Sequence, residues 1–166
     1  MQSLDNSSLP LFLQKQFEIG ELANIHIDDI FVAVKSSSLK TITYTSIYST
    51  PHYFFIKNYL KNESRLTIDN SYQKYTVDNS DACSSEDFIH LADSINNNGY
   101  SHEFKPIYVF KHWTRALPFG RFDVADGFHR LAIIAVLGHT TVTVCKLKYK
   151  YNIFFRFFFR LFRMKK

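Results

Sequence analysis

From residue 84 onward, apolar positions recur with the spacing first of a helix and then of a strand. Ser84 or Ser85 is a suitable N-cap, and Glu86 and Asp87 would follow in the first turn, where acidic side chains complement the helix dipole. The apolar residues that come next at helical spacing are Phe88, Leu91, Ala92 and Ile95. Gly99 is suited to end this helix in a left-handed conformation.

Two strands are predicted after this helix. Residues 106–110 are apolar on both faces, which is typical of a strand in the middle of a sheet, and Pro106 suits its first position. Residues 112–120 are predicted to form a loop. Residues 121–125 then form a short strand that leads directly into an Asp-Gly turn.

The turn opens a second helix, predicted over residues 128–137 and closed by Gly138. Beyond Arg130 this helix is apolar all round, so it should be buried. Residues 140–147 alternate as a final strand. The predicted order from residue 84 is therefore helix, strand, strand, helix, strand.

The first half of the chain has weaker patterns. Residues 1–20 are expected to be a loosely ordered lead-in, and residues 25–34 are compatible with a short helix or a strand. Residues 41–48 are rich in β-branched and aromatic side chains and should be extended. Residues 51–56 are predicted to be a buried segment, and residues 61–83 a loop with one short helical turn.

Charge is distributed unevenly along the 166 residues, although the net charge is only +5. Residues 146–166 carry eight basic side chains and no acidic one, whereas the rest of the chain is mildly acidic. The basic residues of this stretch are Lys146, Lys148, Lys150, Arg156, Arg160, Arg163, Lys165 and Lys166. Such asymmetry indicates a tail with a partner of its own.

The two cysteines, Cys83 and Cys145, are far apart and have no metal-ligand spacing. They are expected to be reduced thiols, which fits a cytoplasmic protein. No signal peptide and no apolar run of membrane-spanning length is present, so a cytoplasmic location is expected.

The polar residues of the second helix are gathered at its start, in the sequence Asp126-Gly127-Phe128-His129-Arg130. A helix N-terminus offers unpaired N–H groups and a positive partial charge, and Gly127 allows close approach of an anion. Arg130 can grip two phosphate oxygens, and His129 can donate a hydrogen bond or exchange a proton. The segment is therefore a candidate phosphate site.

Asp126 has four candidate roles that the residues alone leave open. It can cap the helix, pair with Arg130 one turn later, hold Mg²⁺, or accept a hydrogen bond from a hydroxyl that is to be phosphorylated. The other histidines show no metal-ligand spacing. Among them, His52 lies in an aromatic segment and is a candidate to reach the site.

Two motifs in order resemble the ParB/sulfiredoxin-like domain family. In the first, Leu91-Ala92-Asp93-Ser94-Ile95 leads through Gly99 to Pro106-Ile107-Tyr108-Val109, and in the second Asp126 to Ala132 precedes a Val-rich strand. The resemblance covers residues 84–147, and residues 52–60 are a candidate earlier strand. It implies an α+β fold with a small mixed β-sheet and packed helices, and nucleotide phosphates bound at the second motif.

Two departures from the family's sequence pattern reduce the number of activities that the resemblance implies. Phe128 stands where sulfiredoxins have their catalytic Cys, and no helix-turn-helix follows, as it does in DNA-partition members. The Asp-Gly-x-His-Arg form is closer to the kinase-like members, which use an acidic residue near the first motif as a base. Glu86, Asp87 and Asp126 are the candidates for that residue here.

The tail is expected to form one helix with a cationic stripe and a broad aromatic face, typical of a helix lying on an anionic membrane. The residues predicted to contact the membrane are Phe154, Phe155, Arg156, Phe158, Phe159, Arg160, Phe162 and Arg163. Packing on its own domain or on a second copy, and contact with single-stranded nucleic acid, are the alternatives.

The sequence thus predicts three parts: an N-terminal extension over residues 1–50, a ParB/sulfiredoxin-like domain over residues 51–148, and a tail over residues 149–166. The first functional hypothesis is a kinase-like enzyme that binds ATP, ADP or CTP, with Mg²⁺ as a candidate, and phosphorylates an unknown small molecule. Asp126 and His129 would be catalytic, with residues 127–130 holding phosphate. The alternatives are a non-catalytic nucleotide-dependent module tethered by its tail, and a nuclease or DNA-binding protein.

Overall fold

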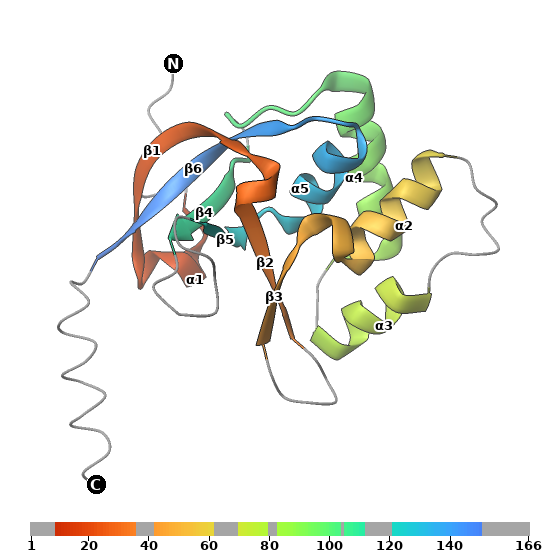
Figure 1. Ribbon diagram of the computed structural model, residues 1–166, viewed down its shortest axis with the longest axis horizontal. Coiled ribbons are helices and arrows are strands. Elements are labelled where there is room, and N and C mark those ends of the chain that lie inside the picture. Colours follow the sequence, from red (N-terminus) through yellow and green to blue (C-terminus); the bar gives the residue numbers. More distant parts are fainter. Residues whose placement is uncertain are drawn as a thin grey trace, which may run out of the picture.

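The computed structural model describes residues 9–35, 42–61, 70–79, 83–103, 105–111 and 121–150 (Figure 1). Within these ranges the chain combines a six-stranded mixed sheet with five α-helices. The helices are α1 Leu11–Gln14, α2 Pro51–Leu60, α3 Asn70–Asn79, α4 Ser85–Asn98 and α5 Phe128–Val136. The strands are β1 Phe17–His26, β2 Ile30–Lys35, β3 Ile42–Ser46, β4 Ile107–Lys111, β5 Phe122–Asp126 and β6 Thr141–Tyr149. The α+β class with a mixed sheet is confirmed.

The strands lie in the order β1-β6-β4-β5-β2-β3. β4 runs parallel to β6 and antiparallel to β5, while β5 runs parallel to β2. The outer pairs, β1 with β6 and β2 with β3, are antiparallel. The predicted central position of residues 106–110 is correct, since Ile107 and Val109 are fully buried.

Each face of the sheet has its own apolar core. On one face, β4, β5 and β6 pack against α2, α4 and α5 around a large cluster that includes Phe88, Ile107 and Leu131. On the other face, a smaller cluster forms under α1 from Leu9, Leu13, Phe17, Tyr108, Cys145 and Leu147. Figure 1 shows α2, α3 and α4 together, away from α1.

The two helices predicted from the second half of the sequence are confirmed. Ser84 caps α4, because its Oγ accepts from the Asp87 backbone N–H at 3.0 Å, and Gly99 follows the helix with φ +77°. α5 begins directly after Gly127, and residues 131–135 are all buried as the apolar pattern requires. The order helix, strand, strand, helix, strand is also confirmed.

Several predictions for the first half are wrong. Residues 51–60 form helix α2 rather than a strand: Thr50 Oγ1 accepts from the Tyr53 N–H, Pro51 takes the first position, and burial has helical spacing. Residues 61–83 include the ten-residue helix α3, which is more than a short turn. The lead-in ends earlier than predicted, because β1 starts at Phe17 and pairs with β6.

The ambiguous segment 25–34 is resolved as the end of β1, the 3₁₀ turn Ile27–Asp29 and most of β2. The extended prediction for 41–48 is confirmed over β3, which the 3₁₀ turn Ile47–Ser49 follows. Segment 1–50 thus contributes three strands to the same sheet. The predicted loop at 112–120 and the tail from residue 151 lie outside the described residues.

Cys83 and Cys145 are both free thiols, as predicted. Burial raises the pKa of Cys145 to about 11, so this thiol is protonated at neutral pH. In the described part of the chain, no helix is long and apolar enough to cross a membrane.

Candidate functional site

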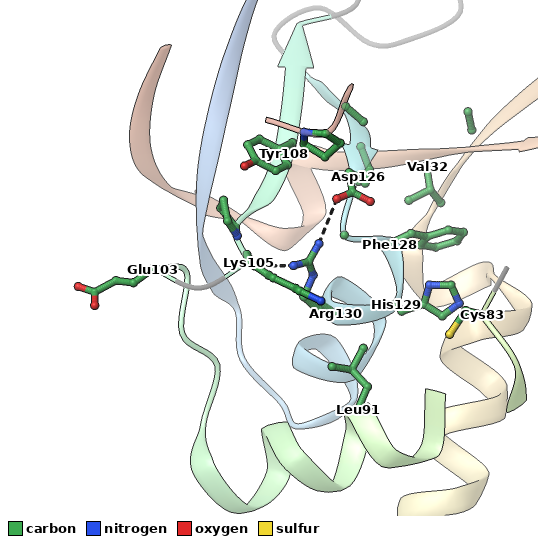
Figure 2. A pocket seen from close by; sticks show the side chains of 16 residues that line it. Val32, Cys83, Leu91, Glu103, Lys105, Tyr108, Asp126, Phe128, His129 and Arg130 are labelled. Carbon is green, nitrogen blue, oxygen red and sulfur yellow. Dashed lines mark hydrogen bonds and ion pairs between the residues drawn. The ribbon is translucent and has the colours of Figure 1, made fainter. Parts of the chain in front are cut away.

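A cavity of about 740 Å³ opens where β5 ends and α5 begins. Its wall is built from segments far apart in sequence, brought together by the central strands (Figure 2). The lining residues are Pro10, Val32, Ala33, Cys83, Leu91, Glu103, Lys105, Pro106, Tyr108, Val124, Ala125 and all five residues from Asp126 to Arg130. The structure therefore places the whole predicted phosphate segment in the wall of one cavity.

The first turn of α5 has no side-chain cap. The residue before the helix is Gly127, with φ +93°, and the turn closes through the Leu131 N–H to the Gly127 carbonyl at 3.0 Å. Glycine is required here for two reasons. L side chains rarely adopt this φ, and an added Cβ would lie 3.0 Å from Ile107 Cα and from the Arg130 guanidinium.

Arg130 is held in place by two protein groups. One terminal nitrogen donates to the Lys105 carbonyl at 2.6 Å, and the other lies 3.3 Å from Asp126 Oδ2 (Figure 2). The arginine side chain is only 12% exposed. Further N–H groups of the guanidinium are left for a ligand, because these two bonds do not exhaust its donors.

Asp126 does not cap α5, so the capping alternative is wrong. Its carboxylate instead forms the i, i+4 pair with Arg130, which is one of the alternatives that the sequence left open. The Asp126 side chain is 38% exposed and stays accessible from the cavity. Glu103, a second acidic residue of the wall, points away from Asp126 and Arg130 in Figure 2.

His129 lies on the opposite side of the site from Lys105 (Figure 2). Its Nε2 is 3.1 Å from the hydroxyl of Tyr72 on α3. The imidazole also packs edge-on against Phe88, with ring centroids 4.6 Å apart. A proton exchanged at His129 would therefore be shared with Tyr72, which serves as donor or acceptor according to the tautomer of the imidazole.

His52 lies behind the site in an aromatic cluster. It is fully buried on α2, stacks on Phe128 with centroids 4.0 Å apart, and meets the His129 ring edge-on at 4.7 Å. His52 thus contacts two residues of the site through their rings and does not reach the cavity. His52 itself is not among the residues that line the cavity.

Glu86 and Asp87 are not brought to the cavity. Both are exposed in the first turn of α4, and neither lines the wall. A hydrogen bond from the Ser84 hydroxyl, 2.7 Å from the carboxylate, lowers the pKa of Asp87. This geometry gives Asp87 the role of stabilising the helix start.

Three residues that the sequence analysis did not select belong to the site. Lys105 supplies a cationic side chain and the carbonyl that holds Arg130. Cys83 lines the wall near His129 (Figure 2), and Tyr72 bonds to His129. The sequence feature that could have pointed to Lys105 is its position directly before Pro106, the first residue of the predicted strand. No local pattern marks Tyr72 or Cys83, because both reach the site through tertiary packing.

The cavity has the size and the mixed lining of a small-molecule site. Its volume lies within the usual range for small-molecule sites, and its wall combines apolar and aromatic side chains with Lys105 and Arg130. Within the described ranges, no group of three or more His, Cys, Asp or Glu side chains can hold a metal ion. Asp126 alone would suit Mg²⁺ only with substrate phosphates as further ligands.

Comparison with known proteins finds no matching family model, no matching curated protein and no matching solved structure. The likeness of residues 84–147 to ParB/sulfiredoxin-like domains thus stays a hypothesis that rests on its two motifs. The order of helices and strands follows from the residue pattern and does not by itself identify a family.

Proposed function

We propose that the start of α5 binds the phosphate groups of a nucleotide, and that the protein is a kinase-like phosphotransferase with a ParB/sulfiredoxin-like fold. One observation carries the proposal. The first turn of α5 has no side-chain cap, lines a cavity of about 740 Å³, and has Arg130 and Lys105 beside it. Backbone N–H groups, the helix dipole and two cations act together on an anion.

Arg130 is suited to phosphate because it is already oriented. The Lys105 carbonyl, 2.6 Å from one terminal nitrogen, holds the guanidinium plane toward the start of α5. A side chain that is fixed in advance loses less conformational entropy when the ligand binds. Lys105 is exposed and can approach a second phosphate oxygen as a mobile point charge.

The apolar part of the wall supports a nucleotide rather than a free phosphate ion. Val32, Val124, Tyr108 and Phe128 line the same cavity as the cationic groups. Aromatic and aliphatic side chains favour the flat, weakly polar surface of a base. ATP, ADP and CTP satisfy this combination equally, so the choice among them is left to measurement.

Asp126 is the residue proposed to act on the molecule that accepts the phosphoryl group. An acceptor hydroxyl would lose its proton to Asp126 while its oxygen bonds to the terminal phosphorus. The bond from that phosphorus to the bridging oxygen would break, and the nucleoside diphosphate would leave from ATP. Alternatively, Asp126 would hold Mg²⁺, and the ion would supply positive charge to the phosphates. His129, which bonds to Tyr72, would assist charge stabilisation or proton transfer. Phosphoryl transfer depends mainly on positioning and electrostatics, so this small set is sufficient in principle.

A non-catalytic nucleotide-dependent module is the second candidate, and a specific observation favours it. Arg130 and His129 are already hydrogen-bonded to protein groups, at 2.6 Å and 3.1 Å respectively. Asp126 is paired with Arg130 at 3.3 Å, so its carboxylate is already in contact with a protein group. A site so constrained can bind phosphate without turning it over.

Calorimetry with ATP, ADP and CTP, with and without Mg²⁺, tests both candidates. A phosphotransferase is expected to bind one of them and, when hydroxyl-bearing small molecules are added, to release that nucleotide with one phosphate fewer. Binding without turnover of any acceptor in the panel would favour the module. No binding of any of the three nucleotides would overturn both candidates.

A further inference from the structure

Strands β2 and β5 run parallel but pair at only two positions in the described part of the chain, and the second position joins Phe31 to Asp123. Beyond it both strands continue, β2 along β3 and β5 along β4. The segments 32–33 and 124–125 therefore face each other without a ladder between them. Both segments line the cavity, so part of the cavity is a crevice between two strands that separate at their C-terminal ends.

A β-bulge in β5 lies where the two strands separate. Val124 lies opposite Val109 of β4. Two residues later, Asp126 lies opposite Tyr108, which leaves Ala125 as an extra residue without a partner in β4. A bulge bends its strand and increases the local twist. It is therefore a physical reason for β5 to diverge from β2 at the position where the cavity begins.

The crevice leaves main-chain hydrogen-bonding groups without strand partners. In a strand, every second residue directs its N–H and C=O toward a given neighbouring strand. The Val124 N–H donates to the carboxyl of Asp123. For the other groups of segments 32–33 and 124–125 that face the crevice, no partner is found among the residues that the structure describes. Main-chain groups inside proteins are almost always hydrogen-bonded, so the crevice suits a ligand that offers both a donor and an acceptor.

The side chains around the crevice suit a flat, weakly polar ring. Val32 and Val124 lie on the sheet face that carries the larger core. Ala125 lies on the opposite face, and Ala33, which follows Val32 in the strand, is directed to that face as well. Valine methyl groups on one side and small alanine side chains on the other leave room for a planar ring with apolar faces.

The crevice adjoins the proposed phosphate site. Segment 124–125 leads directly into Asp126 at the end of β5. Figure 2 shows Val32 and Phe128 on the side of Asp126 that is away from Lys105. A single nucleotide can therefore extend from the crevice to the cationic groups at the start of α5.

We infer that the crevice between β2 and β5 binds the base of the nucleotide, and that main-chain groups of segments 32–33 and 124–125 bond to an edge of the base that carries an amino group. Since the phosphates of the same nucleotide would lie at the start of α5, this assignment rests on the proposed function. Adenine and cytosine each have an amino donor beside a ring-nitrogen acceptor, which complements the C=O and N–H of one strand residue. Main-chain groups are common to all residues, so no sequence motif marks this subsite.

Nucleotide analogues without the amino group test the hydrogen bonds. Calorimetry compares ATP with purine riboside triphosphate, and CTP with the triphosphate of pyrimidin-2-one riboside. For the natural nucleotide that binds more tightly, loss of the amino group should weaken binding about tenfold, because a main-chain carbonyl in the crevice loses its donor. The phosphates are unchanged, so equal affinities would overturn the assignment.

Ala33→Leu tests the position of the base. Ala33 is exposed and lines the cavity, so the larger side chain should leave the fold intact and fill part of the crevice. Nucleotide affinity should fall about tenfold or more. Thr43→Leu is the matched control, because Thr43 is exposed on the neighbouring strand β3 and does not line the cavity. Its affinity should match that of the unmodified chain, and circular dichroism checks the folding of both variants.

Adenosine and cytidine, which lack phosphate, separate the crevice from the phosphate site. Their binding is measured by saturation-transfer NMR. A nucleoside that binds the unmodified chain but not Ala33→Leu would support the crevice, and equal affinity of nucleoside and nucleotide would then overturn the phosphate site alone. Nucleotide binding that is the same in Ala33→Leu and Thr43→Leu would overturn the crevice and leave the phosphate site. No binding of any nucleoside or nucleotide would overturn both.

Discussion

The guanidinium of Arg130 lies 3.3 Å from the carboxylate of Asp126, four residues earlier in the chain, in the wall of the cavity at the start of α5. The pair unites the two charges that the sequence marked as functional. It also sets up a competition, because a bound phosphate and the Asp126 carboxylate would both attract the same cation. The variants described next test the contributions of Arg130 and Asp126 one at a time.

Replacing Arg130 by Lys should weaken nucleotide binding by about tenfold or more, because the charge is kept and the planar fork is lost. Calorimetry with the nucleotide that binds best measures the effect. Arg121→Lys is the control, since Arg121 also contacts a carbonyl and a carboxylate, those of Asp28 and Asp29, and does not line the cavity. Equal affinity of the two variants would contradict a phosphate role for Arg130.

Asp126→Asn should distinguish catalysis from pairing. If Asp126 accepts the proton of the acceptor hydroxyl, turnover should fall by about 10² to 10⁴ while nucleotide binding persists or tightens. If it only pairs with Arg130, turnover should hold and stability should change by about 0.5 kcal/mol or less. Steady-state kinetics and thermal unfolding of the same sample decide between these outcomes.

Gly127→Ala should destabilise the fold by roughly 2–4 kcal/mol, from its positive φ and from the contacts of a Cβ 3.0 Å from Ile107. Gly138→Ala is a matched control, because Gly138 also has positive φ, at +85°, but nothing lies within 4 Å of its Cβ position. The control should cost only about 1–2 kcal/mol. Equal costs in urea unfolding would show that the close approach at Gly127 contributes nothing.

Asp123 should make the free energy of unfolding fall as pH rises from about 4 to 7. The side chain is 4% exposed, Oδ1 has no hydrogen-bond partner among the residues that the structure describes, and burial raises its pKa from 3.8 to about 7. In that window the unfolded chain releases a proton that the folded chain keeps, so folding weakens by up to roughly 4 kcal/mol.

Asp123→Asn provides the control for this pH dependence. The amide cannot ionise, so the variant should match the unmodified chain near pH 4 and exceed its stability above pH 7. Urea unfolding across that range measures the difference between the two curves, which removes contributions from other carboxylates. Parallel curves would show that Asp123 has the same pKa in the folded and unfolded chains.

The sequence alone determined the structure where a helix cap, an apolar run or a glycine marked the end of an element. Ser84 before two acidic residues, the apolar run after Arg130 and the glycines at 99, 127 and 138 define α4 and α5 to within a residue or two. These signals act within one or two turns, so they need no distant partner. The sequence also predicted that Asp126, His129 and Arg130 lie together at the start of one helix.

Only the tertiary structure decided the rest. Residues 51–56 carry strand-like composition but form a helix, because α5 and α3 offer packing partners for Phe55 and Ile56. α3 owes its place to Tyr72, which is buried between Phe55 and Phe88 and reaches His129. The Lys105 carbonyl that holds Arg130 is 25 residues away along the chain. Burial and hydrogen bonding between distant segments depend on the whole fold, and no local pattern of residues records them.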